Sequence, residues 1–364
     1  MTTQPNLFLS AVGAVFSNGY LASVLLVGTF LMFTVIGVIF ARRSGVFFLA
    51  AEGVLVFSAT AGYFANAATR AALLGSAAEG SAAYEAALGR ADVLGWVAGL
   101  FCGLAGGMAF TLLFCWFLLR VKSNALLTSF ALNVFASAGA GVLMHLVNRG
   151  DGAVSSAVAA ALPSLKLSAL AEVPVLGGLV GDTGWFTYLA LLLPPAAFYL
   201  LNRTGFGLRL RAAEENPIAL TATGLDVSRT QLYGMLFAGA AVSLGGVTLV
   251  MSGPAPVFSA LPHGEGYLAL AAVWACDGRL WKSSVAVLLL ALVGALARVL
   301  HELPLPVSLI QALFYAAALA GLLLHSHNDK HRHKVSLRAQ RRMVEGKEEV
   351  KKKRERKKRP EKKK

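Results

Sequence analysis

The chain has 364 residues, of which 56% are hydrophobic and only 14% are charged, a composition outside the usual range of soluble globular proteins. The net charge of +14 is unevenly distributed, because residues 326–364 hold 18 Lys and Arg against six Asp and Glu. Composition therefore excludes an ordinary soluble domain and favours an integral membrane protein with a basic tail.

Apolar runs long enough to cross a hydrocarbon core of roughly 30 Å as helices occur throughout residues 21–325. We predict crossings near residues 21–41, 46–66, 93–119, 125–147, 185–201, 231–251, 283–301 and 307–325. The shorter stretch 264–276 must also cross if loops rich in Lys and Arg are to alternate with loops poor in them. Otherwise it is a broken or re-entrant segment. The predicted fold is all-α, a polytopic membrane helix bundle of about nine transmembrane helices.

The distribution of Lys and Arg predicts the orientation of this bundle, because cytoplasmic loops of membrane proteins carry the excess of basic residues. The expected inner loops carry Arg42, Arg43, Arg120, Lys122, Arg203, Arg209, Arg211, Arg229, Arg279 and Lys282. The expected outer loops, near 67–92 and 147–184, carry only Arg70, Arg90, Arg149 and Lys166. We predict an outside N-terminus and a cytoplasmic C-terminus in the inner membrane. Residues 1–20 form an N-terminal interfacial segment, 21–325 the membrane domain and 326–364 a disordered cytoplasmic tail.

Glycines mark helix packing and helix breaks. Four of them recur every fourth residue along one predicted span, which leaves a groove for close approach of another backbone (Gly95, Gly99, Gly103, Gly107). The segments that begin at Gly45 and Gly264 are both glycine-punctuated, aromatic and Ala-rich, and they would cross in opposite senses. This pattern indicates broken helices and a possible inverted repeat, an architecture that places a transport site at the repeat interface.

A short helix with both ends marked is predicted in the inner loop 204–226. Asn216 is a good N-cap, Pro217 suits the first helical position, and Gly224 suits a left-handed stop. A helix of about two turns is unstable alone in water. It is either a docking element for a partner or an ordinary amphipathic connector.

This loop resembles the coupling loop of ABC-importer permeases of the branched-chain amino acid, ribose and simple-sugar/nucleoside superfamily, which carry strings like TxFGxxxRAxGENPxAAxxxGI. The matching residues are Thr204, Phe206, Gly207, Arg211, Ala212, Glu215, Asn216, Pro217, Ala219, Gly224 and Leu225. Glu214 stands where the family has Gly. Segments 43–53, 124–133 and 264–271 resemble further motifs of the superfamily, in its order. The Glu52-Gly53 pair favours the simple-sugar/nucleoside branch.

The resemblance implies a permease subunit that pairs with a homologous or identical permease, two cytoplasmic ATPase subunits and an extracytoplasmic solute-binding protein. The ATPase-coupling residues would be Arg211, Glu214, Glu215, Asn216, Pro217, Ala219 and Gly224. The chain contains no GxxxxGK[ST] phosphate loop. We therefore expect no catalytic residue and no cofactor on this chain, with ATP and magnesium used by the partner ATPase.

Three residues within the predicted spans are candidates for the translocation path: Glu52, Asn133 and Tyr267. A carboxylate inside a membrane is a functional hypothesis by default. Glu52 could accept hydrogen bonds from ribose hydroxyls, stabilise the break of a discontinuous helix, or be capped by amides around Gly45 near the cytoplasmic end. Asn133 could join helices or bind a ligand. Tyr267 could stack on a ring or belong to the core.

Two other readings remain open. An ion- or proton-coupled secondary transporter would act without an ATPase, and a non-transporting membrane scaffold would recruit partners through its tail. The tail itself suits anionic lipid at the inner leaflet, and we expect no nucleic acid because it lacks an aromatic platform. The three cysteines, Cys102, Cys115 and Cys276, lack CxxC spacing. The histidines cluster only near the tail, so we expect no metal site.

Overall fold

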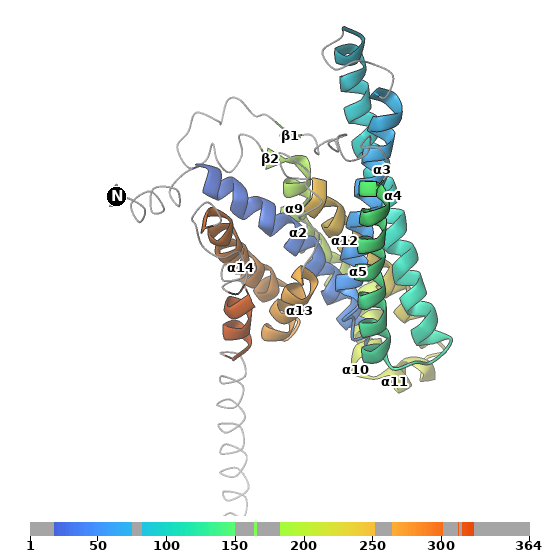
Figure 1. Ribbon diagram of the computed structural model, residues 1–364. Helices are drawn as coiled ribbons and strands as arrows, with labels where there is room; N and C mark the ends of the chain where they lie inside the picture. The colour runs from blue at the N-terminus through green and yellow to red at the C-terminus, as the bar shows by residue number, and fades with distance from the viewer. Residues whose placement is uncertain are drawn as a thin grey trace, which may run out of the picture.

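The computed structural model describes residues 18–74, 82–149, 164–165, 183–251, 264–300, 312 and 315–323. They form an all-α bundle (Figure 1), the predicted fold class. Its helices are α2 (Asn18–Arg43), α3 (Ala51–Leu74), α4 (Ala82–Leu119), α5 (Ala125–Arg149), α9 (Trp185–Arg203), α10 (Gly205–Glu215), α11 (Pro217–Ala222), α12 (Val227–Met251), α13 (Glu265–Ala275) and α14 (Leu280–Leu300). A two-residue ladder pairs β1 (Ser164–Leu165) antiparallel with β2 (Thr183–Gly184).

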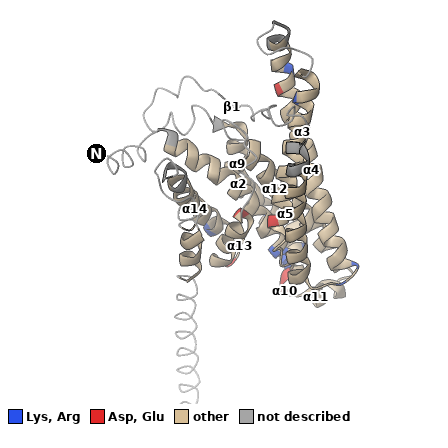
Figure 2. Ribbon diagram, in the orientation of Figure 1, with Lys and Arg blue, Asp and Glu red and all other residues tan. Residues whose placement is uncertain are grey.

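Five helices within the described residues are long and apolar enough to cross a membrane. They are Tyr20–Arg43, Ala87–Leu119, Ala125–Leu143, Trp185–Arg203 and Val227–Met251. Charged segments are few on the ribbon: they lie in the upper part of α3 and α4, around α13 and near α10, and most of the remaining ribbon carries none (Figure 2). The protein is a multi-pass membrane protein, and the number of about nine crossings stays a prediction.

Two helices form the centre of the bundle. The membrane-spanning windows of α2 and α12 are 89% and 78% buried, against 33% or less for those of α4, α5 and α9. Helix α4 packs along α3 through its glycines, as predicted. A Cβ added at Gly99 would lie 2.8 Å from the Gly62 carbonyl oxygen, and one added at Gly103 would lie 2.8 Å from that of Ser58. The glycine stripe is therefore a helix-packing surface.

The sequence-based boundaries of the second crossing, 46–66, are wrong at their start. Helix α2 ends at Arg43, Gly45 has a φ of +74°, and residues 46–50 are not helical. Helix α3 begins at the fully buried Ala51, inside the bundle. The hydropathy pattern missed this break because apolar residues have the same hydropathy in helical and non-helical chain.

The stretch 264–276 forms α13, an 11-residue helix. Eleven residues rise about 16 Å, roughly half the hydrocarbon core. Helix α13 is therefore not a full crossing, and the broken-segment alternative describes it.

Several predicted segments fall outside the described residues: the interfacial segment through residue 17, the tail 326–364, and residues 307–311, 313–314 and 324–325 of the span 307–325. In that last span, residues 315–323 are helical.

Candidate functional site

The N-termini of α3 and α13 meet inside the bundle, and Glu52 joins them. One carboxylate oxygen, Oε1, accepts a hydrogen bond from the Gly264 backbone N–H at 2.8 Å. The other, Oε2, accepts one from the Gly266 N–H at 2.6 Å. Amides at a helix start have no partner within the helix and carry partial positive charge, which suits a carboxylate. Glu52 thus caps α13, and the amides around Gly45 proposed from the sequence are not its partners.

Glycine permits this close approach. A Cβ added at Gly266 would lie 2.7 Å from the Glu52 Cα and 2.8 Å from its backbone nitrogen. Gly264 adopts a φ of +116°, which L-residues with side chains rarely adopt. Gly264 is therefore needed for its backbone conformation, and Gly266 is needed because a larger side chain would not fit.

Asn133 of α5 completes the junction. Its Oδ1 accepts from the Gly53 N–H at 2.9 Å, and its Nδ2 donates to the Leu49 carbonyl at 3.0 Å and to the Tyr267 hydroxyl at 2.9 Å. A single amide side chain thus connects α5, the non-helical segment before α3, and α13. Asn133 lies eight residues beyond the start of α5, about 12 Å along that helix. The junction is therefore well inside the bundle.

An open cavity of about 710 Å³ borders this junction. Its lining residues come from α3, α5, α13 and the 315–323 helix: Glu52, Val56, Phe130, Asn133, Val134, Ser137, Ala138, Ala140, Gly264, Tyr267 and Tyr315. The structure thus brings together all three residues singled out from the sequence, Glu52, Asn133 and Tyr267. It adds Tyr315, which no local sequence signal distinguished. Apolar walls with a few convergent polar groups are typical of small-molecule sites.

The coupling-type loop has the predicted local structure. Asn216 caps α11, its side chain accepts from the Ala219 N–H at 3.0 Å, and Pro217 is the first helical residue. Thr223 is the C-cap, and Gly224 has a φ of +80°. Ile218 on this helix is 80% exposed. A capped helix with an apolar residue projecting outward is suited to contact with another protein.

The predicted coupling residues divide into two groups. Glu215, Asn216, Pro217, Ala219 and Gly224 are exposed, whereas Glu214 and Arg211 are partly buried. Glu214 turns toward the end of α2, where its Oε2 accepts from Arg43 Nη1 at 3.0 Å. Sequence reasoning missed this pairing, because residues 171 positions apart give no local signal of contact.

Comparison with known proteins agrees with this architecture. Residues 20–324 match the family model described as the permease component of the branched-chain amino acid transport system. This chain belongs to that permease family. The match covers the membrane domain, including the Glu52 junction and the α10–α11 loop of this permease.

Several curated relatives are similar along most of the permease. The nucleoside ABC transporter permease NupC of Lactococcus lactis is 27% identical over 83% of this chain and 90% of its own length. The guanosine ABC transporter permease NupQ of Bacillus subtilis is 25% identical over 67% of this chain and 70% of its own length. A putative glucose ABC transporter permease of Haloferax volcanii is 24% identical over 85% of this chain and 84% of its own length. These relatives support the simple-sugar/nucleoside branch. No solved structure shows significant similarity.

Proposed function

We propose that this permease is the membrane subunit of an ATP-driven importer and forms the translocation path for a nucleoside-like or simple-sugar solute. The observation that carries the proposal is the cavity at the meeting point of two internal helix N-termini, bordered by Glu52, Asn133 and Tyr267. Discontinuous helices near the membrane midplane are a common transporter device. The names of the relatives favour nucleosides and simple sugars as the solute class.

The chemistry of the cavity suits a neutral solute with hydroxyl groups. The Tyr267 hydroxyl accepts from Asn133 and keeps its own hydrogen for donation, and Phe130, Val56 and Val134 supply apolar wall. A furanose or pyranose ring has polar edges and a less polar face, so both kinds of surface would be used. Four lining residues of α5 are exposed, and a second permease packed against them would close the path (Phe130, Val134, Ser137, Ala138).

The ATPase cycle would be coupled to the permease through α11. In this proposal, a separate ATPase contacts the exposed face of α10 and α11 around Ile218 and Glu215, and its closure on ATP moves these helices. The ATP and magnesium are bound by that partner. The excess of Lys and Arg in the expected inner loops supports a cytoplasmic position for α10 and α11. In this proposal the N-terminus is outside, the C-terminus is inside, and a solute-binding protein acts on the outer side.

The ion-coupled alternative needs several buried acidic side chains along a relay. Among the described residues that line the cavity, Glu52 is the one carboxylate. The ATP-driven reading therefore has the stronger physical basis.

Co-purification from native membranes tests the proposal. We expect the tagged wild-type chain to carry vanadate-sensitive ATP hydrolysis and Ile218→Asp to lose most of it, because a charge would replace an apolar contact. Val121→Asp is the matched control, since Val121 is a 53%-exposed apolar residue at the α4–α5 turn. Equal ATPase activity in all three preparations would show that α11 is not the docking element.

A further inference from the structure

We propose that Glu214 is a positioning residue that ties the α10–α11 connection to α13, so that movement of the ATPase-docking helices moves the helix that borders the cavity. This inference rests on the proposed function. It assigns Glu214 a role inside the bundle, although the sequence placed it among residues at the ATPase contact.

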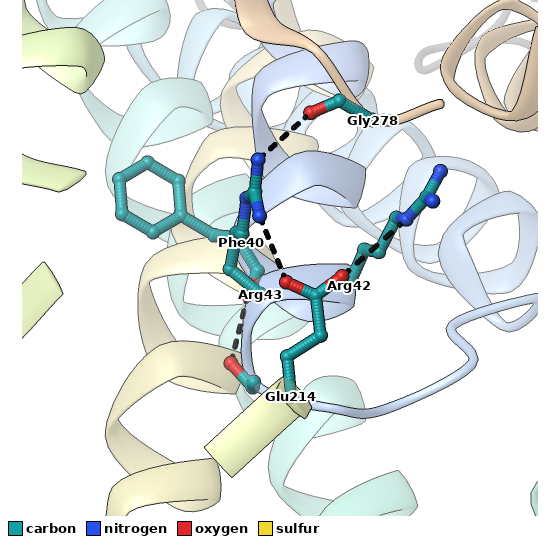
Figure 3. A network of polar contacts seen from close by, with 6 residues as sticks. Phe40, Arg42, Arg43, Glu214 and Gly278 are labelled. Atoms are coloured by element: carbon teal, nitrogen blue, oxygen red, sulfur yellow. Dashed lines mark hydrogen bonds and ion pairs between the residues drawn. The ribbon is translucent and has the colours of Figure 1, made fainter. Parts of the chain in front are cut away.

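The first link joins Glu214 to the end of α2. Its Oε2 accepts from Arg43 Nη1 at 3.0 Å, and its Oε1 lies 3.6 Å from Arg42 Nε (Figure 3). The Glu214 side chain is 22% exposed, so much of its surface is already covered. One carboxylate thus lies between two neighbouring guanidinium groups and offsets one of their two positive charges, and its removal would leave both charges uncompensated.

The second link joins the same arginines to the C-terminal end of α13. Arg43 Nη2 donates to the Gly278 carbonyl at 3.4 Å, as Figure 3 shows, and the Arg42 guanidinium lies 4.8 Å from the centre of the Trp274 ring. Gly278 has a φ of +65°, and a Cβ added there would lie 2.8 Å from Arg42 Nε. The turn after α13 is therefore fitted closely against the arginine pair.

The third link is α13 itself. Its far end is capped by Glu52 through Gly264 and Gly266, and its Tyr267 lines the cavity. A helix of 11 residues is a rigid rod of about 16 Å. Glu214 and the cavity thus lie at opposite ends of a continuous set of contacts through Arg43, Gly278 and α13.

Backbone packing supports the same connection. Gly45, with a φ of +74°, lies against the end of α10, and a Cβ added there would be 3.0 Å from the Ala213 carbonyl oxygen. The α2–α3 segment therefore touches the residue before Glu214 directly. Displacement of α10 pushes on this segment as well as pulling on the ion pairs.

Charge reversal tests the proposal. The variants are Glu214→Arg, the swap Glu214→Arg with Arg43→Glu, and Asp92→Arg, which breaks the 2.9 Å Arg70–Asp92 pair between α3 and α4 as the matched control. Each is reconstituted with the ATPase subunit that co-purifies with the wild-type chain. Solute uptake, ATP hydrolysis and ATPase stoichiometry are measured on the same vesicles.

We expect Glu214→Arg to keep its ATPase while uptake per ATP hydrolysed falls roughly tenfold, the factor expected for loss of one charge-assisted hydrogen bond. The swap restores an ion pair but removes the donor to the Gly278 carbonyl, so it should leave coupling low, and Asp92→Arg should match the wild type. The proposal is overturned if Glu214→Arg loses its ATPase as Ile218→Asp does, if coupling stays normal, or if the swap restores full coupling.

Failure of the proposed function gives a different result, because the wild-type chain would then carry no ATPase at all. A double-mutant cycle at Glu214 and Arg43, measured by thermal unfolding of the protein in detergent, needs no ATPase partner. Additive effects of the two substitutions would show that the pair does not interact and would also overturn the proposal.

Discussion

Glu52 and Gly266 are 214 positions apart in the sequence, yet the Gly266 N–H donates to Glu52 Oε2 at 2.6 Å. This hydrogen bond fixes the start of α13 against the start of α3, and the cavity lies beside it. The relative positions of α3, α5 and α13 beside the cavity depend on that junction.

Gly266→Ala should disrupt the junction, because the new Cβ would overlap the Glu52 backbone at 2.7–2.8 Å. Such overpacking destabilises by about 1–3 kcal/mol. We expect a lower unfolding temperature in detergent and reduced uptake. Gly139→Ala is the matched control, since a Cβ there meets nothing within 4 Å. Wild-type behaviour of both variants would contradict the close packing described here.

Glu52→Ala should be more damaging than Glu52→Gln. Alanine leaves the Gly264 and Gly266 amides without their acceptor, and each buried unsatisfied group costs about 1–3 kcal/mol. Glutamine keeps one carbonyl oxygen, which can still accept a hydrogen bond from either the Gly264 or the Gly266 amide. The check is thermal unfolding together with uptake, and the account is wrong if glutamine is as harmful as alanine.

Asn133→Asp should cost more than Tyr267→Phe. Aspartate keeps the acceptor for the Gly53 N–H but replaces the donor to the Leu49 carbonyl with a charged oxygen, which repels it. Tyr267→Phe removes only one hydroxyl from the network, for about 1 kcal/mol. Unfolding temperatures of the two variants decide this ordering, and a reversed order would mean that Asn133 is not the central connector.

Asn216→Ala should weaken the docking helix without disturbing the bundle. Loss of an N-cap side chain destabilises a helix by about 1 kcal/mol, and α11 has only six residues to absorb that loss. We expect reduced ATPase association at an unchanged unfolding temperature. Asn216→Ser, which can still cap, should behave like the wild type, and an equal defect in both variants would argue against the cap.

Local signals in the sequence predicted local structure well. Asn216, Pro217 and Gly224 act within a single turn of chain, so the capped α11 followed from residue type alone. The glycine spacing in α4 likewise predicted close helix packing. In each case the physical cause lies within a few residues of its effect.

Features that depend on distant contacts could not be predicted in the same way. Glu52 was recognised as a functional candidate, but its partners at Gly264 and Gly266 come from another region of the chain. Residues 46–50 are apolar like their neighbours, so nothing in their hydropathy marked the non-helical segment. The inward turn of Glu214 depends on Arg42 and Arg43, which no spacing rule connects to it.

We propose that a separate ATPase, bound to α10 and α11, drives solute through the cavity at Glu52. Vesicles containing this chain alone, and vesicles containing it with its co-purifying ATPase, should be compared for accumulation of labelled nucleosides and sugars, with binding protein present in both. We expect accumulation only with the ATPase and ATP. Accumulation by the chain alone, driven by an imposed ion gradient, would contradict it.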